Sequence, residues 1–132
     1  MHDQKPSILI IDDEEGIREY LRYVLETAGY LVSEAINGKD GIRQLERTEA
    51  EIIITDLCMP EMEGLEMIKI IKARNHPCGI IALSGTTNSD TYLEIARHMG
   101  AHAVLEKPVD RARLLSLIES VYQQTHFNLK KA

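Results

Sequence analysis

Short apolar runs rich in β-branched residues alternate along this chain with longer stretches in which apolar residues recur every three or four positions. The runs cover residues 7–11, 31–34, 52–56, 79–83 and 103–105. This alternation predicts strands separated by helices, because parallel neighbours in a sheet need a crossover connection of that kind. The pattern therefore predicts an α/β domain in which a doubly wound parallel sheet carries helices on both faces.

The helical stretches follow the strands one by one. Their core-facing residues are expected to be Ile17, Leu21, Val24 and Leu25, then Ile42 and Leu45, then Leu65, Ile68 and Ile71, then Tyr92, Ile95, Ala96 and Met99, and finally Leu114, Leu117, Ile118 and Val121. Gly29 and Gly100 predict helix ends. Ile42 and Leu45 predict a short second helix, and Gly41 predicts that it is the weakest, since glycine costs about 1 kcal/mol there relative to alanine. Because the periodicity ends with the fifth helix, we expect residues 1–124 to form the domain and residues 125–132 a frayed, flexible tail.

Polar residues stand where four of the predicted strands end. Asp12 and Asp13 follow the first strand, Asp56 closes the third, Ser84 follows the fourth and Lys107 comes just after the fifth. In a doubly wound parallel sheet the carboxyl ends of the strands share one edge, and ligands bind in the crevice there. The sequence thus predicts one small site that combines three carboxylates, a hydroxyl and a lysine.

The length, net charge and hydropathy of the chain argue against several classes of function. The 132 residues suit one domain, and a net charge of -6 with scattered basic residues argues against a nucleic-acid surface. No apolar run approaches the ~18 residues of a membrane span, and the polar N-terminus lacks the apolar core of a signal peptide, so we expect a cytoplasmic protein without membrane contact. Cys58 and Cys78 fall at opposite ends of the predicted sheet, roughly 16 Å apart, too far for a disulfide.

Four short motifs carry a resemblance to a known family. They are Ile-Ile-Asp12-Asp13, Asp56-Leu-Cys-Met-Pro60 with Gly64, Leu-Ser84-Gly85, and Lys107-Pro108. In this order, each at a predicted strand end, they resemble the receiver domain of bacterial two-component response regulators over residues 7–123. The resemblance implies a flavodoxin-like (CheY-like) fold of five parallel strands in the order 2-1-3-4-5 with five helices.

The resemblance also implies how the acidic residues act. Asp56 is the expected phosphoacceptor, which takes a phosphoryl group from the phosphohistidine of a sensor histidine kinase or a histidine phosphotransfer protein. Asp12, Asp13 and Asp56, with the backbone carbonyl of Cys58, are the expected ligands of Mg²⁺ or Mn²⁺. Physical chemistry agrees, because carboxylates about 5 Å apart repel by roughly 3 kcal/mol per pair at an effective dielectric of 20, and a hard cation relieves this.

The remaining positions are expected to bind the phosphoryl group and pass on its signal. Ser84 matches the hydroxyl that bonds the phosphoryl group, and Lys107 matches the family's cation. At Val104 the family usually has an aromatic residue whose rotamer follows phosphorylation, and a stiff β-branched side chain cannot replace it. Cys58 and Thr86 lie where the family tunes the access of water, which predicts slow to moderate self-dephosphorylation.

Two rival functions remain to be weighed. An aspartyl-phosphate phosphotransferase or phosphatase of another α/β family needs a second carboxylate two residues after the nucleophile, where this chain has Cys58. A mononucleotide-binding module needs a glycine-rich turn after the first strand, where this chain has Asp12-Asp13-Glu14-Glu15. We therefore expect a signalling switch rather than a dedicated enzyme, with an output partner that the sequence does not name. A phosphorylation-dependent homodimer through the fourth helix, fifth strand and fifth helix is a further expectation.

Overall fold

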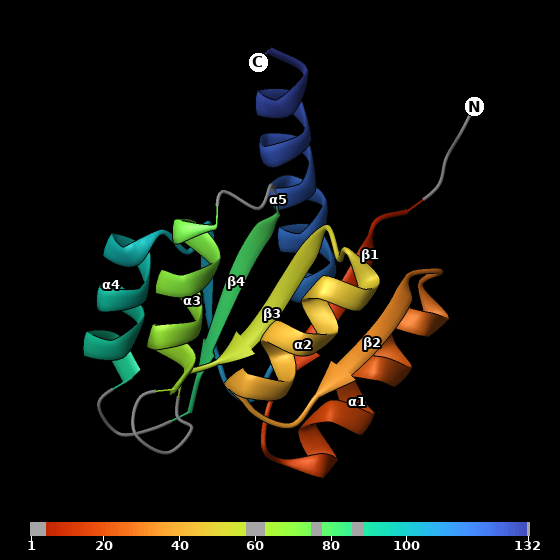
Figure 1. The fold of residues 1–132 in the computed structure, drawn as a ribbon. Helices are drawn as coiled ribbons and strands as arrows, with labels where there is room; N and C mark the ends of the chain where they lie inside the picture. Colours follow the sequence, from red (N-terminus) through yellow and green to blue (C-terminus); the bar gives the residue numbers. More distant parts are fainter. Residues whose placement is uncertain (1–4, 58–62, 75–77, 86–88, 132) are drawn as a thin grey trace.

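The computed structural model describes residues 5–57, 63–74, 78–85 and 89–131. Its centre is a five-stranded parallel sheet in the order β2-β1-β3-β4-β5 (Figure 1), which confirms the predicted fold. The elements are β1 (Ser7–Ile11), α1 (Glu15–Thr27), β2 (Leu31–Ala35), α2 (Gly38–Thr48), β3 (Ile52–Asp56), α3 (Glu63–Ala73), β4 (Gly79–Ser84), α4 (Ser89–Met99), β5 (Ala103–Glu106) and α5 (Arg111–Lys131). Within these described ranges, no helix is both long and apolar enough to cross a membrane.

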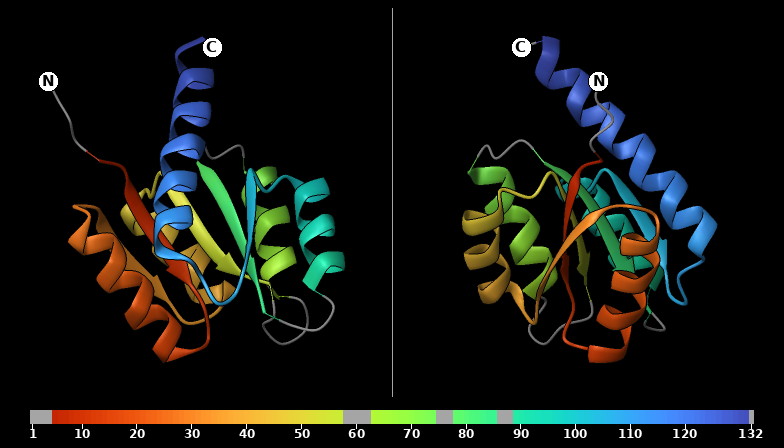
Figure 2. Two further views of the ribbon diagram at one scale, coloured as in Figure 1. Left: turned by 180° about the vertical axis from the view of Figure 1, so that it is seen from behind. Right: turned by 90° about the vertical axis from the view of Figure 1, so that its right-hand side faces the viewer.

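The two faces of the sheet carry separate apolar cores, because successive residues of a strand point to opposite faces. In β1, Leu9 and Ile11 belong to the core under α2, α3 and α4, whereas Ile8 and Ile10 belong to the core under α1 and α5 (Figure 2). All four side chains are buried. Burial on both faces explains why the strands are continuously apolar in the sequence rather than alternating.

The predicted helix ends at two glycines are confirmed. Gly29 has φ 97° and Gly100 has φ 119°, both in the left-handed region. At the end of α1, the Gly29 N–H donates to the Glu26 carbonyl and the Tyr30 N–H to the Leu25 carbonyl, each at 3.0 Å. This pair of bonds satisfies carbonyls that the helix end leaves without intrahelical donors.

Helix α2 is as long as α3 and α4. It has 11 residues, and the side chain of Asn37 caps it by accepting a hydrogen bond from the Asp40 N–H at 2.8 Å. Gly41 also has a packing role, which the low helix propensity of glycine does not reveal. A Cβ atom at Gly41 would lie 2.8 Å from both Ile11 Cδ1 and Met67 Cε. The glycine therefore lets α2 approach the sheet closely.

Helix α5 continues to Lys131, so the expectation of a frayed tail from Thr125 is wrong in its secondary structure. The last turns of α5 extend past the edge of the sheet (Figures 1 and 2). Apolar periodicity marks the face of a helix that is buried, and it stops where the helix leaves the sheet even though the helical backbone does not. The division of the chain at residue 124 remains a prediction.

Candidate functional site

The carboxyl edge of the sheet gathers the residues that end its strands. Asp12 follows β1, Asp56 ends β3 opposite Leu83 of β4, and Ser84 ends β4. Asp12, Asp56 and Ser84 are buried at this edge, with exposed fractions of 0%, 1% and 0%. The backbone N–H of Lys107 donates to the Ser84 carbonyl at 2.9 Å, which ties the residue after β5 to the end of β4. The peptide bond between Lys107 and the proline that follows it is cis.

Lys107 lies among three carboxylates. Its Nζ is 3.1 Å from Asp12 Oδ2, 3.4 Å from Glu14 Oε1 and 3.5 Å from Asp56 Oδ1. The Lys107 side chain is 12% exposed, whereas Glu14 is 63% exposed. A Cβ atom at Gly85 would lie 3.2 Å from Lys107 Cβ and Cδ, so the glycine lets the aliphatic part of the lysine pass close to the backbone.

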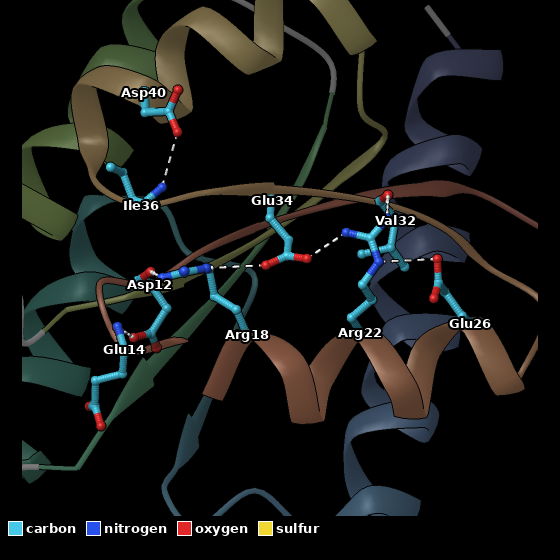
Figure 3. A network of polar contacts seen from close by, with 9 residues as sticks. All are labelled: Asp12, Glu14, Arg18, Arg22, Glu26, Val32, Glu34, Ile36 and Asp40. Carbon is cyan, nitrogen blue, oxygen red and sulfur yellow. Dashed lines mark hydrogen bonds and ion pairs between the residues drawn. The ribbon is translucent and has the colours of Figure 1, made fainter. Parts of the chain in front are cut away.

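The backbone and side chain of Asp12 are held from several directions. Its N–H donates to the Ala35 carbonyl at 3.2 Å, and its carbonyl accepts a hydrogen bond from Arg18 Nη1 at 2.8 Å. Its Oδ1 accepts a hydrogen bond from the Glu14 N–H at 2.9 Å (Figure 3). The buried Oδ2 pairs with Lys107, yet no donor among the described residues meets it in hydrogen-bond geometry.

Burial and charge shift the pKa values of the central pair. Burial raises the pKa of Asp12, and the nearby Asp56 carboxylate raises it further. The hydrogen bond from the Glu14 N–H and the charge of Lys107 lower this pKa, but the net shift is upward. Burial lowers the pKa of Lys107, but the carboxylates of Asp56 and Asp12 outweigh it, so the pKa lies above its ordinary value. The lysine therefore stays cationic, while the site retains uncompensated negative charge.

The oxygen donors fit a hard divalent cation. Asp12, Asp13, Glu14 and Asp56 each offer one carboxylate oxygen, and these oxygens lie within 4.8 Å of one another. A set of oxygens without nitrogen or sulfur suits Mg²⁺. The buried Asp12 Oδ2 without a hydrogen bond from a described donor is an atom that such an ion would satisfy.

The structure brings together most of the residues that the sequence singles out. Asp12, Asp13, Asp56 and Lys107 converge, and Ser84 ends the neighbouring strand. Val104 is half-buried and packs against the core under α2, α3 and α4. The predictions for Cys58 and Thr86 lie outside the described residues. Cys78 is buried as a free thiol, and burial raises its pKa to about 11.

Two residues of the site were missed at the sequence level. Glu14 joins both the acidic cluster and the contacts of Lys107, and Arg18 donates to the Asp12 backbone. The acidic run that contains Glu14 was a signal, but the run alone does not distinguish a side chain at the site from a solvated one. The position of Arg18 one helical turn after Glu14 was a second signal, because residues four apart lie on one helix face.

The fold and the acidic cluster define an α/β domain with a site suited to a cation at the carboxyl edge of its parallel sheet. Comparison with known proteins identifies the family. The model of the response regulator receiver domain matches residues 8–119. An uncharacterized 14.6 kDa protein in the sodA1 3' region of Leptolyngbya boryana is 34% identical, covering 85% of this chain and 86% of that protein. The transcriptional regulatory protein FixJ of Bradyrhizobium diazoefficiens is 31% identical over 91% of this chain. A CheY-like receiver domain protein from Methanospirillum hungatei JF-1 has a solved structure with a TM-score of 0.85 and 26% identity, covering 95% of this chain and 99% of that one.

The chain belongs to the receiver domain family of two-component response regulators. Its function is that of a phosphorylation-controlled signalling switch. The chain spans 58% of the length of FixJ, so the output of that whole regulator says nothing direct about this chain.

Proposed function

We propose that this switch is set by transfer of a phosphoryl group to Asp56 from the phosphohistidine of a sensor histidine kinase or a histidine phosphotransfer protein. The observation that carries the proposal is the position of Asp56, a carboxylate with 1% exposure at the end of β3 and 3.5 Å from Lys107 Nζ. An oxygen of Asp56 forms the new O–P bond while the P–N bond of the donor breaks, and the imidazole leaves with the electron pair.

Three side chains support this transfer. Lys107 is shared among carboxylates at rest, and it pairs with a phosphoryl oxygen once the group is attached. Ser84, at the end of β4, donates its hydroxyl to a second phosphoryl oxygen. Asp12 and Asp13 hold Mg²⁺ or Mn²⁺ together with Asp56. When bound, the metal supplies positive charge that offsets repulsion between these carboxylates and the phosphoryl oxygens.

The proposed role is a switch rather than a turnover enzyme. The rival phosphotransferase or phosphatase needs an acid/base carboxylate two residues after Asp56, and the residue there is Cys58. The rival nucleotide-binding module fits poorly, because the crowded carboxylates of the acidic cluster would repel a polyphosphate.

The output surface is part of the proposal. Val104 is stiff and half-buried, so it cannot change rotamer as the aromatic residue usual in the family does. The signal therefore leaves through the loop after Ser84 and the face formed by α4, β5 and α5. This face is also the proposed surface of a phosphorylation-dependent homodimer. The roles of Cys58 and Thr86 in dephosphorylation and the cytoplasmic location stay predictions.

Phosphorylation by acetyl phosphate and magnesium tests the acceptor. We expect intact-mass spectrometry to show one added phosphoryl group that hydroxylamine removes, as it removes an acyl phosphate. Asp56→Asn should accept none, whereas Asp40→Asn, which removes a carboxylate of α2 outside the acidic cluster, should be phosphorylated like the parent. Stoichiometric phosphorylation of Asp56→Asn would show that the acceptor is another residue.

A further inference from the structure

We infer that Arg18 is a positioning residue for the metal site, and that Glu34 holds Arg18 in place. The inference rests on the proposed function, since it concerns the magnesium ligands of that same site. Arg18 lies in α1, and Glu34 lies in β2, outside the acidic cluster.

The contacts of Arg18 join the two elements to the acidic loop. Arg18 Nη1 donates to the Asp12 carbonyl at 2.8 Å, and Arg18 Nε donates to Glu34 Oε1 at 3.1 Å (Figure 3). The side chains of Arg18 and Glu34 are only 14% and 27% exposed. A guanidinium group is planar and presents its donors in a fixed fork, so a carboxylate that fixes one edge also fixes the direction of the other donors.

Glu34 is itself held from a second side. Its Oε2 accepts a hydrogen bond from Arg22 Nη1 at 2.5 Å, and Arg22 Nη2 donates to the Val32 carbonyl at 3.3 Å. Arg22 Nε also donates to Glu26 Oε2 at 3.2 Å (Figure 3). Glu34 thus lies between two arginines one turn apart on α1, and only Arg18 reaches the acidic loop.

The bond to the Asp12 carbonyl bears on metal binding through the peptide plane. This carbonyl belongs to the planar peptide that links Asp12 to Asp13. Its orientation therefore fixes the positions of the Asp13 nitrogen and Cα atoms. With the Asp12 N–H bound to Ala35, Arg18 fixes the other end of the residue. The exposed Asp13 is thus already oriented for metal binding in the metal-free protein. Less conformational entropy is then lost when the cation binds.

Isothermal titration with Mg²⁺ on four proteins tests the inference. Arg18→Met should raise the Kd for Mg²⁺ about tenfold, as expected when a group that orients a metal ligand is lost. Arg18→Lys should recover part of the affinity, because an ammonium group can reach one of the two acceptors but not both. Arg22→Met is the matched control, and it should change the Kd less than about twofold, since the bond from Arg18 to Asp12 remains.

Two further measurements separate positioning from a general loss of structure. Thermal unfolding without magnesium should show Arg18→Met and Arg22→Met destabilised to a similar degree. The rate of phosphorylation by acetyl phosphate should fall in Arg18→Met at low magnesium and recover at saturating magnesium, because the ion then orders the loop itself. If Arg18→Met does not fold, Glu34→Gln takes its place, with an expected rise in Kd of about threefold.

A folded Arg18→Met protein that binds Mg²⁺ as the parent does would overturn the inference, and so would an equal loss of affinity in Arg22→Met. Either result leaves the proposed function standing, because the parent still binds the ion. A parent protein that does not bind Mg²⁺ at all would instead contradict the metal site of the proposed function, and the inference with it.

Discussion

At the scale of single residues, Lys107 is the point where the charges of the site meet. Its ammonium group faces two buried carboxylates, Asp12 and Asp56, and one exposed carboxylate, Glu14. The buried pair is part of the proposed machinery. The exposed Glu14 adds negative charge beside the lysine, and we expect it to compete with a phosphoryl group for Lys107.

Glu14→Gln should therefore speed phosphorylation by the anionic donor acetyl phosphate. An ion pair with one exposed partner is worth about 0.2–1 kcal/mol, so the initial rate at saturating magnesium should rise roughly 1.4- to fivefold. The gain should shrink as salt screens the charge. Glu15→Gln makes the same change of charge one residue further on, outside the acidic cluster. An equal gain in Glu15→Gln would mean that overall charge, rather than the contact with Lys107, sets the rate.

His102 gives stability a dependence on pH. Its Nδ1 accepts a hydrogen bond from the Ile80 N–H at 3.0 Å, which only the unprotonated nitrogen can do. Burial and the charge of Lys72 lower the pKa of His102 in the folded protein. The stabilisation is therefore complete above the unfolded pKa of about 6.5 and is lost as the pH falls through the lower, folded pKa.

His102→Asn tests this dependence, because its side-chain oxygen can take the place of Nδ1 without titrating. Urea unfolding at pH 7.5, 6 and 5 should show the parent losing stability relative to His102→Asn as the pH falls. A difference between the two proteins that stays constant over this range would show that His102 does not titrate on unfolding.

At the scale of elements, the packing of α5 on the sheet depends on a glycine at the start of β4. A Cβ atom at Gly79 would clash with Val121 Cγ1 of α5. A valine on a helix has one strongly preferred rotamer, so turning its side chain away from the clash costs energy. The two elements therefore approach each other at a distance that only glycine permits.

Gly79→Ala should lower the free energy of unfolding by about 1–3 kcal/mol, the usual cost of overpacking a core. Gly16→Ala is the matched control, because a Cβ atom there would meet nothing within 4 Å, and we expect it to be neutral or stabilising by up to about 1 kcal/mol. In denaturant unfolding, Val121→Ala should recover much of the loss when combined with Gly79→Ala. Simple additivity of the two changes would argue against this contact as the cause.

At the scale of the whole molecule, the acidic site lowers the stability of the metal-free protein and at the same time provides the proposed ligands for a metal ion. Carboxylates gathered within 4.8 Å of one another repel when no metal ion is bound, and Lys107 offsets only part of this repulsion. A ligand that binds only the folded state adds about 2.7 kcal/mol at a hundredfold excess over its Kd. The melting temperature of the parent should therefore rise with magnesium.

Asp13→Ala removes a proposed, exposed ligand of the metal and separates these two effects. Without magnesium its melting temperature should equal or exceed that of the parent, because a like charge is gone. Adding magnesium should then have little effect, and phosphorylation that depends on magnesium should be lost. A steep fall in the melting temperature without magnesium would mean that Asp13 stabilises the fold, contrary to the repulsion that we describe.

The sequence by itself determined the alternation of strands and helices and the residues that end the strands. β-branched runs buried on both faces of a sheet leave an unambiguous pattern, and parallel topology brings their carboxyl ends to one edge. For this reason the sequence alone assigns Asp12, Asp56 and Lys107 to one site. The motifs around them, rather than the periodicity, supplied the family and the order of the strands.

Only the tertiary structure decided which side chains complete the site and how far the helices run. Glu14 and Lys107 are 93 residues apart in sequence, and Arg18 meets Glu34 across the packing of α1 on β2. Such contacts depend on the distance between packed elements and the direction of each side chain, which local patterns do not encode. The same holds for Gly79, whose role comes from the approach of Val121, and for the end of α5, where the helical backbone continues beyond the apolar periodicity of the sequence.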